Sequence, residues 1–365
     1  MSNKIGFIGV GQAGSNVCEV AETLGYKTLV VNTSPEDLDS LQLVNNRLLV
    51  GRQGGSGKDR NIAKRELKEK YKEVAAFVAQ RFQNSEIELI YVVFSTGGGT
   101  GSGMGPLLID ILKTLTPGKL YGAITILPSK DESAVAHANS YECLKELSSL
   151  SVPTIIVDND KCKAKSKPVL YDTVNEAVIE DLDMLLNSKR SPSKYGNIDT
   201  KDIIKLLTTP GVTTIGLLTD INMSLPLSTQ IIHSFNDSPY APLEMDGVIS
   251  RIGMIYEVNK DVVNMINNDE IFNVLGTPLE LFEGIYTDAK NSNVISIILS
   301  GQSFPLERAK SLLDVVNSSK EKFATKSDFT LDTDALDWFH DKRSNSLAKK
   351  EHVKDIDISA LFKKY

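Results

Sequence analysis

Short apolar runs alternate with polar, helix-forming stretches through the first third of the chain. The runs are Ile5–Val10, Lys27–Val31, Leu89–Phe94 and Leu120–Leu127, and glycines border several of them. Buried parallel strands read as continuous apolar runs, and strands that alternate with helices predict βα units. The residues up to about Pro128 are therefore expected to form a parallel sheet covered by helices.

A fifth strand and a long helix are predicted to complete this first domain. The apolar run Thr154–Val157 is followed by a segment with apolar residues at helical spacing, which are Val174, Val178, Leu182 and Leu185. This spacing places one apolar stripe on a helix over about 171–187. We expect this central helix to end a domain that covers residues 1–188.

The rest of the chain predicts a smaller α+β domain, residues 189–323, and a tail. After the polar segment Ser188–Ile198 the pattern predicts further elements, which are a helix at Lys201–Leu207, strands near Thr213–Leu218, Val248–Tyr256 and Asn293–Leu299, and a C-terminal helix near Leu306–Phe323. From Ala324 the apolar density falls and the charge rises, except at residues 356–362. Residues 324–365 are therefore expected to form a charged, partly mobile tail with a terminal docking segment.

Composition narrows the function classes. The 365 residues are 41% hydrophobic and carry a formal charge of −7, which argues against direct nucleic-acid binding because phosphate contacts need a basic surface. Three cysteines without metal-ligand spacing indicate reduced thiols. No cleavable leader and no window of 18 uncharged apolar residues are found. These features predict a cytoplasmic protein that is not inserted in a membrane.

The first motif that carries chemistry is Gly9-Val10-Gly11-Gln12-Ala13-Gly14, between a strand and a helix. Glycines there let backbone amides approach a phosphate at the helix N-terminus. The pattern also matches the fingerprint of an NAD-dependent dehydrogenase, which remains an alternative. Such an enzyme usually has Asp or Glu after its second strand, whereas this strand is followed by Asn32-Thr33-Ser34.

The second motif is Gly97-Gly98-Gly99-Thr100-Gly101-Ser102-Gly103, after the strand Leu89–Phe94. Five glycines in seven positions carry a large entropic cost in an ordered region, so they indicate close approach of the backbone to a ligand. Amides and a threonine hydroxyl directed at one point suit an anion such as a di- or triphosphate. Two phosphate-binding turns after separate strands predict a mononucleotide.

This heptapeptide resembles the glycine-rich signature of the tubulin and FtsZ superfamily, and the chain is most similar to the plasmid and phage TubZ (RepX) GTPases. The resemblance covers Ile5 to about Leu207. It implies an α/β fold of tubulin/FtsZ type, in which a Rossmann-like parallel-sheet GTPase domain is joined by a central helix to an α+β domain. It also implies GTP or GDP and Mg²⁺ as ligands, although no protein ligand for the metal is named.

The resemblance assigns binding roles to residues in seven segments. Phosphate contacts fall on Gly11, Gln12, Ala13, Gly14 and Asn16, with Asn32 in the next loop, and on Gly97, Gly98, Gly99, Thr100 and Gly101. A γ-phosphate loop would comprise Gly55, Ser56 and Gly57, although a solvated turn is the alternative; the Walker pattern fails at Arg52 and Asp59. Glu132 would bind the ribose, and Asn159, Tyr171 and Asn175 the guanine. FtsZ has an arginine where Ala136 stands.

A distal segment, Gly196–Asp202, resembles the loop that one subunit inserts against the nucleotide of its neighbour. The resemblance makes Asn197, Asp199 and Asp202 the catalytic residues. The spacing also has a simpler explanation, since Asp199 and Asp202 could cap the following helix. The two roles are compatible, because carboxylates beside helix amides stay ionised and can orient water.

The resemblance therefore implies an assembly-coupled GTPase that polymerises head to tail with itself. TubZ-like systems also imply plasmid or phage DNA partitioning, with the tail contacting a DNA-binding adaptor; a tail that only maintains solubility is the alternative. Besides the dehydrogenase, a non-hydrolysing scaffold with a tubulin fold is the remaining alternative.

Overall fold

The computed structural model describes residues 4–51, 54–82, 86–162, 164, 166–188, 190–244, 246–287, 293–324 and 364–365. The strands are β1 (Ile5–Val10), β2 (Lys27–Asn32), β3 (Arg47–Leu49), β4 (Leu89–Ser95), β5 (Leu120–Leu127), β6 (Pro153–Asp158), β7 (Gly211–Leu218), β8 (Arg251–Glu257), β9 (Glu280–Tyr286) and β10 (Val294–Gln302). The helices are α1 (Gly11–Thr23), α2 (Pro35–Asp39), α3 (Arg60–Arg81), α4 (Thr100–Leu115), α5 (Ala134–Ser148), α6 (Lys167–Asn187), α7 (Thr200–Leu207), α8 (Leu227–Asp237), α9 (Lys260–Val263), α10 (Asn268–Leu275) and α11 (Leu306–Ala324).

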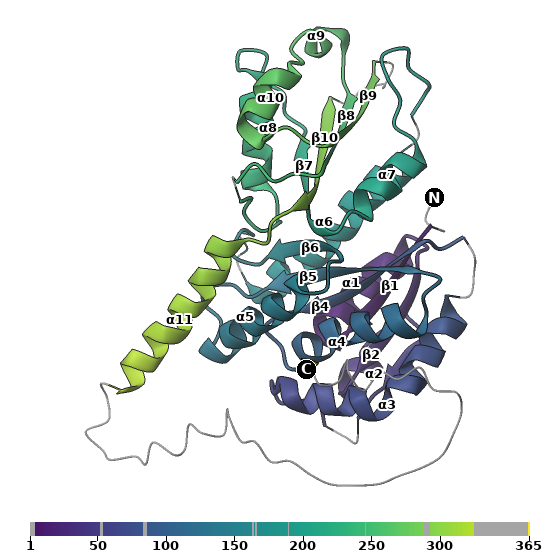
Figure 1. The fold of residues 1–365 in the computed structure, drawn as a ribbon, viewed down its shortest axis with the longest axis vertical. Helices are drawn as coiled ribbons and strands as arrows, with labels where there is room; N and C mark the ends of the chain where they lie inside the picture. The colour runs from purple at the N-terminus through teal and green to yellow at the C-terminus, as the bar shows by residue number, and fades with distance from the viewer. Residues whose placement is uncertain are drawn as a thin grey trace.

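All ten strands belong to one sheet, in the order β3-β2-β1-β4-β5-β6-β7-β10-β8-β9 (Figure 1). The six strands from β3 to β6 are parallel, as the alternation of apolar runs and helices predicts. β7 pairs with β6 over only Pro153–Ile155, and β10 is antiparallel to both β7 and β8. The fold is thus mixed α/β, with a short joint between its two halves.

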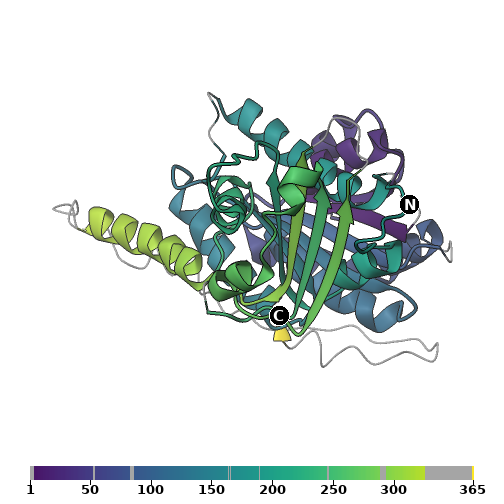
Figure 2. The same ribbon diagram turned by 90° about the horizontal axis from the view of Figure 1, so that it is seen from above.

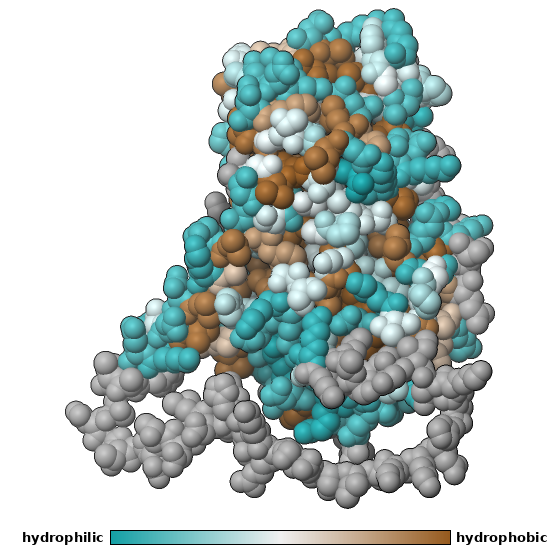
Figure 3. Space-filling view, in the orientation of Figure 1, coloured by the Kyte–Doolittle hydropathy of each residue, from teal (hydrophilic) through white to brown (hydrophobic). Residues whose placement is uncertain are grey.

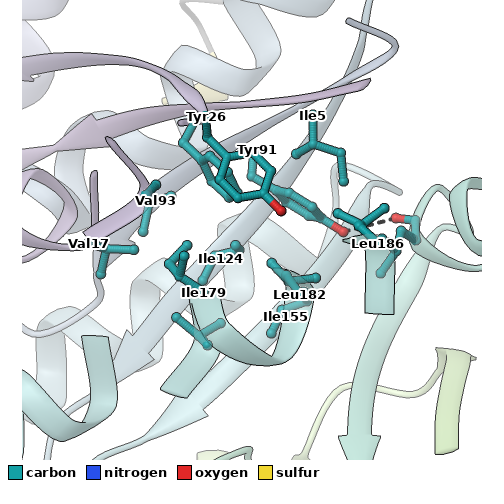
Figure 4. Close-up of a cluster of buried hydrophobic side chains, with 14 of the residues drawn as sticks. Ile5, Val17, Tyr26, Tyr91, Val93, Ile124, Ile155, Ile179, Leu182 and Leu186 are labelled. Carbon is teal, nitrogen blue, oxygen red and sulfur yellow. Dashed lines mark hydrogen bonds between the residues drawn. The ribbon is translucent and has the colours of Figure 1, made fainter. Parts of the chain in front are cut away.

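Alternate residues of the parallel strands face two separate cores. Phe7 of β1 and Tyr91 of β4 face a cluster with α1, α6 and α7, whereas Ile8 and Val92 face a cluster with α3, α4 and α5. Figure 4 shows the first cluster, in which α6 lays Ile179, Leu182 and Leu186 against the sheet. Helices therefore cover both faces of the parallel half, as buried parallel sheets require.

The second half has a core of its own, made by α8, α10, β8 and β10. Figure 3 shows hydrophobic patches on this half of the molecule. Exposed apolar side chains in this half include Leu225, Val248, Val274 and Leu279. The Leu279 side chain is 86% exposed.

A buried ion pair attaches α11 to the parallel half. The Arg308 guanidinium donates to both carboxylate oxygens of Asp158, at 2.7 and 3.0 Å, and to the Pro128 carbonyl at 2.7 Å. Asp158 and Pro128 lie at the ends of β6 and β5. Arg308 therefore fixes the start of α11, which then extends away from the body of the molecule (Figure 2).

Most predicted elements are present, with shifted boundaries. β1 and β5 have the predicted bounds, and the central helix α6 starts at Lys167 instead of near 171. Both glycine motifs extend into helices, because α1 begins at Gly11 and α4 begins at Thr100. The predicted terminal docking segment, 356–362, lies outside the described residues. The division into domains at residue 188 stays a prediction.

Candidate functional site

Two glycine-rich turns meet at the carboxyl ends of β1 and β4, where α1 and α4 begin. Gly11 has φ +71°, and a Cβ added to it would lie 3.1 Å from the Gly101 nitrogen and 3.3 Å from the Thr100 Cβ. The first turns of both helices thus lie side by side. The free amides of a helix N-terminus attract anions, and two adjacent ones are suited to a ligand with several phosphates.

Packing explains why these positions are glycine. A Cβ on Gly14 would lie 2.0 Å from the Val93 carbonyl oxygen, and one on Gly101 would lie 2.8 Å from the Ser95 carbonyl oxygen. A Cβ added to Gly97 would lie 3.2 Å from the Cβ of Ala136. Gly98 differs, because nothing lies within 4 Å of its added Cβ.

The loop of residues 54–58 lies on the second turn. The Ser56 hydroxyl is 3.1 Å from the Thr100 hydroxyl, which is also 2.7 Å from the Thr33 hydroxyl. Lys58 has φ +65°, rare for a residue with a side chain, and its carbonyl accepts a hydrogen bond from Asn139. We call Gly11–Gly14, Gly97–Gly101 and residues 54–58 together the glycine-rich edge.

Asn32 supports this edge from within its own loop. Its side-chain oxygen accepts hydrogen bonds from the amides of Thr33 and Ser34, and its nitrogen donates to Asp37. The Asn32 side chain is buried. Asn32 therefore fixes the start of the loop in which the Thr33 hydroxyl contacts Thr100, and its place beside the nucleotide stays a prediction.

A pocket of 260 Å³ lies beside the edge, between α1 and α6. Asn16 and Asn175 both line it, together with Glu19, Val20, Ser40, Leu41, Asp172 and Glu176. Gln12 lies one turn before Asn16 on α1 and is exposed, as Asn16 is, whereas Ala13 packs against the core. Asn16 and Asn175, to which the family resemblance gives roles in binding one nucleotide, thus line the same pocket.

The remaining predicted base and ribose residues follow β5 and β6. Tyr171 is 40% exposed, and partial burial together with the nearby Glu132 charge raises the pKa of its hydroxyl. Asn159 is buried, and its side-chain oxygen has no hydrogen-bond partner among the described residues. An unpaired buried amide oxygen is costly, so this atom is suited to accept a hydrogen bond from a ligand.

The three predicted catalytic residues form a separate cluster, which we call the α7 cap. Asp199 accepts hydrogen bonds from the amides of Lys201 and Asp202, and Asp202 accepts one from the amide of Asp199, at 2.9 Å. The side-chain oxygen of Asn197 accepts a hydrogen bond from the Ser193 amide, and its side-chain nitrogen donates one to the Ser193 carbonyl. The capping explanation of this spacing is therefore correct.

The α7 cap does not share an edge with the glycine turns. α7 ends where the Leu207 carbonyl accepts a hydrogen bond from Tyr91, near the start of β4, and β7 then pairs with the first residue of β6. The segment just before α7 lies against β9, where the Ile198 amide donates to the Tyr286 hydroxyl. The glycine turns, in contrast, follow the carboxyl ends of β1 and β4. One chain therefore does not bring Asp202 to its own glycine-rich edge.

Among the described residues, no group of three or more His, Cys, Asp and Glu side chains could hold a metal ion, and no helix has the length and hydropathy to cross a bilayer. The glycine-rich edge does fit a nucleotide, through the close-packed turns and the unpaired Asn159 oxygen. Magnesium in nucleotide sites is held largely by phosphates and water, so the donor set here is compatible with it.

Sequence reasoning missed three contributors to this site. Thr33 and Asn139 position the loop over Thr100, and Arg308 orders the ends of β5 and β6 beside Asn159. Thr33 adjoins a motif that was recognised, so proximity in sequence could have indicated it. Asn139 and Arg308 gave no local signal, because their partners lie more than 40 residues away.

Comparisons with known proteins agree with this geometry. Residues 4–167 match the model of the Tubulin/FtsZ family, GTPase domain. The chain is 27% identical to the tubulin-like protein CetZ of Pyrococcus horikoshii, over 86% of this chain and 88% of that protein. It is 24% identical to the tubulin-like protein TubZ of Clostridium botulinum C phage, over 100% of both.

The fold is shared with a solved filament structure. The GTPγS-form protofilament of Bacillus thuringiensis serovar israelensis TubZ superimposes with a TM-score of 0.75 at 20% identity, covering 89% of this chain and 94% of that chain. The family match places Gly9–Gly14 in a GTPase domain instead of a dinucleotide-binding one. Residues 4–167 therefore match a Tubulin/FtsZ GTPase domain, within a chain that has a tubulin/FtsZ-like fold.

Proposed function

We propose that this protein binds GTP at its glycine-rich edge, assembles head to tail, and hydrolyses GTP where the α7 cap of the next subunit meets that edge. The observation that carries the proposal is the convergence of Gly11, Ser56 and Thr100 on one point. Asn16, Asn159, Tyr171 and Asn175 supply a neighbouring surface for the base, with Glu132 near Tyr171 for the ribose.

Separation of the two clusters within one chain supports a composite site. Phosphoryl transfer depends mainly on positioning and on charge stabilisation, so a subunit without groups to orient water hydrolyses slowly. Asp199 and Asp202 are held by their capping bonds in a fixed arrangement on an accessible helix end. A contact between two different surfaces that does not close generates an open filament. Bound Mg²⁺ would neutralise phosphate charge at this site.

Apolar surface on the second half is suited to such a contact. Leu279 and Leu281 are exposed on or beside β9, the strand against which the α7 cap packs. Burial of exposed apolar groups is a main source of association free energy. The cap and this apolar surface could therefore be buried by one neighbouring subunit.

Phosphate release with GTP across a protein concentration series, recorded together with light scattering, tests the proposal. We expect specific activity to rise steeply above a critical concentration, and Asp202→Asn to lower it about 100-fold while filaments persist. Asparagine is chosen because its oxygen can still accept the Asp199 amide hydrogen bond.

Asp314→Asn is the matched control, because it removes an exposed carboxylate from α11. It should leave turnover unchanged. Activity independent of protein concentration would contradict assembly-coupled catalysis, and filaments without any turnover would favour a non-hydrolysing scaffold.

We also propose that the filaments partition plasmid or phage DNA through an adaptor that binds the tail. Full-length similarity to a phage TubZ supports this role. The expected result is that replacing the gene with its Asp202→Asn form raises the loss rate of the replicon that carries it. An unchanged loss rate in a strain whose filaments no longer turn over would argue for another cargo.

A further inference from the structure

The last two residues of the chain lie against the GTPase half, far along the sequence from α11. Thirty-nine residues, 325–363, separate Ala324 from Lys364 in the sequence. Figure 1 shows the C-terminus beside α4 and α3, whereas α11 ends well away from it, at the lower left. The terminal residues are therefore seated on a specific surface.

Three kinds of contact hold the terminal residues. The Tyr365 ring packs against the core cluster under α3, α4 and α5, and the Lys64 ammonium lies 5.1 Å from the ring centroid. Lys364 pairs with Asp110 of α4 at 3.4 Å. A cation over a ring is worth more where water is excluded, and Lys64 is only 7% exposed. The site thus combines an apolar floor, a buried cation and a carboxylate.

We propose that the dipeptide Lys364-Tyr365 docks in cis in a site built by α3, α4 and α5 of the same chain, and that Glu146 and Arg60 link this site to the glycine-rich edge. Complementary charge supports the assignment, since Lys364 meets Asp110 and the tyrosine ring meets Lys64. Burial and the charges of Asp110 and Glu146 raise the pKa of the Tyr365 hydroxyl, so the docked side chain is neutral.

The link runs through one carboxylate. Glu146 accepts from Lys64 at 2.5 Å and from Arg60 at 2.7 Å, and the same Arg60 nitrogen donates to the Ser102 carbonyl at 2.9 Å. Ser102 lies in the first turn of α4, and Arg60 directly follows the cap residue of α3. Removal of the tyrosine ring would take one contact away from Lys64. The ion pairs that Glu146 makes with Lys64 and Arg60 would then rearrange.

The consequence for nucleotide binding rests on the proposed function. If the glycine-rich edge binds GTP, a docked and an undocked terminus would hold the first turn of α4 differently. The two forms would then differ in nucleotide affinity, and any partner that captured the tail would shift the equilibrium between them. Docking of the terminus and binding of the nucleotide would therefore be coupled, each changing the equilibrium of the other.

Hydrogen exchange of the full-length chain without nucleotide tests the docking. Tyr365→Ala should accelerate exchange in residues 60–68 and 143–147 about fivefold, while Tyr365→Phe should match the wild type. The phenylalanine control is informative because it keeps the ring that packs on the core and lies near the Lys64 ammonium. A synthetic peptide of residues 356–365 should restore protection to Tyr365→Ala, and the same peptide ending in alanine should not.

Equal exchange in wild type and Tyr365→Ala would overturn the docking site. Protection that rises with protein concentration would overturn docking in cis and indicate a contact between subunits. A fluorescent GTP analogue should then bind Tyr365→Ala with an affinity changed about threefold. Equal affinities would overturn the link through Glu146, whereas no binding to either protein would overturn the proposed function and leave the exchange result standing.

Discussion

The glycine-rich edge and the α7 cap differ in how much of their geometry depends on the rest of the chain. At the edge, helices and loops pack so closely that added Cβ atoms at Gly14 and Gly101 would overlap carbonyl oxygens. The cap is a short accessible helix end whose polar groups satisfy one another. The edge is therefore built by tertiary packing, whereas the cap is complete by itself and leaves the Asp199 carboxylate exposed.

Breaking the edge should have the largest effect. Gly14→Ala puts a methyl group where the Val93 carbonyl oxygen stands, 2.0 Å from the ideal Cβ, so strand or helix must move. We expect a loss of about 3 kcal/mol or more in the free energy of unfolding, measured by urea denaturation. Gly98→Ala is the matched control because its Cβ meets nothing within 4 Å. Similar losses in both variants would contradict the packing account.

The stability of the folded protein should depend on pH through a carboxyl group on the central helix α6. Burial raises the pKa of Asp181 on α6 to about 6, against a lowering by the hydrogen bond that Tyr240 donates to it. The carboxyl is thus protonated more easily in the folded state, and its contribution to stability is lost as the pH rises from about 4 through 6.

Asp181→Asn should therefore stabilise the protein by up to about 2 kcal/mol at pH 8 and have little effect at pH 4. Asparagine can still accept the Tyr240 hydrogen bond. Thermal unfolding at the two pH values measures the difference. An equal effect at both values would mean that ionisation of Asp181 does not couple to folding.

Two exposed tyrosines separate the proposed base site from the α7 cap. Tyr171 lies on α6 near Glu132, and Tyr195 precedes the α7 cap; they are 40% and 48% exposed. Loss of stacking at Tyr171→Ala should weaken GTP binding about tenfold, whereas Tyr195→Ala should leave it unchanged. Titration with a fluorescent GTP analogue measures both. Equal affinities would remove Tyr171 from the base site.

The sequence predicted best what depends on neighbours along the chain. The apolar runs located β1 and β5, and the Asp199–Asp202 spacing identified a real capping box. It did not predict β9, whose residues are mostly only partly buried, or α10, a helix of eight residues with two buried side chains. The glycine motifs indicated a ligand but not their meeting point.

Long-range partners could not be predicted from local patterns. Arg308 is an ordinary helix residue in sequence, and its buried pairing with Asp158 appears only when α11 packs across β5 and β6. The same is true of Asn139, which joins the two loops at Lys58 and Gly97. These contacts depend on topology, which no short window contains.

A mixing experiment tests the composite site most directly. Asp202→Asn retains its glycine-rich edge, and Gly98→Asp places a negative charge in the phosphate-binding turn at a position with room for a side chain. Each variant alone should release phosphate slowly. An equimolar mixture should recover a substantial part of the wild-type rate, because the edge of one subunit meets the intact cap of the other; a mixture no faster than the sum of its components would contradict the account.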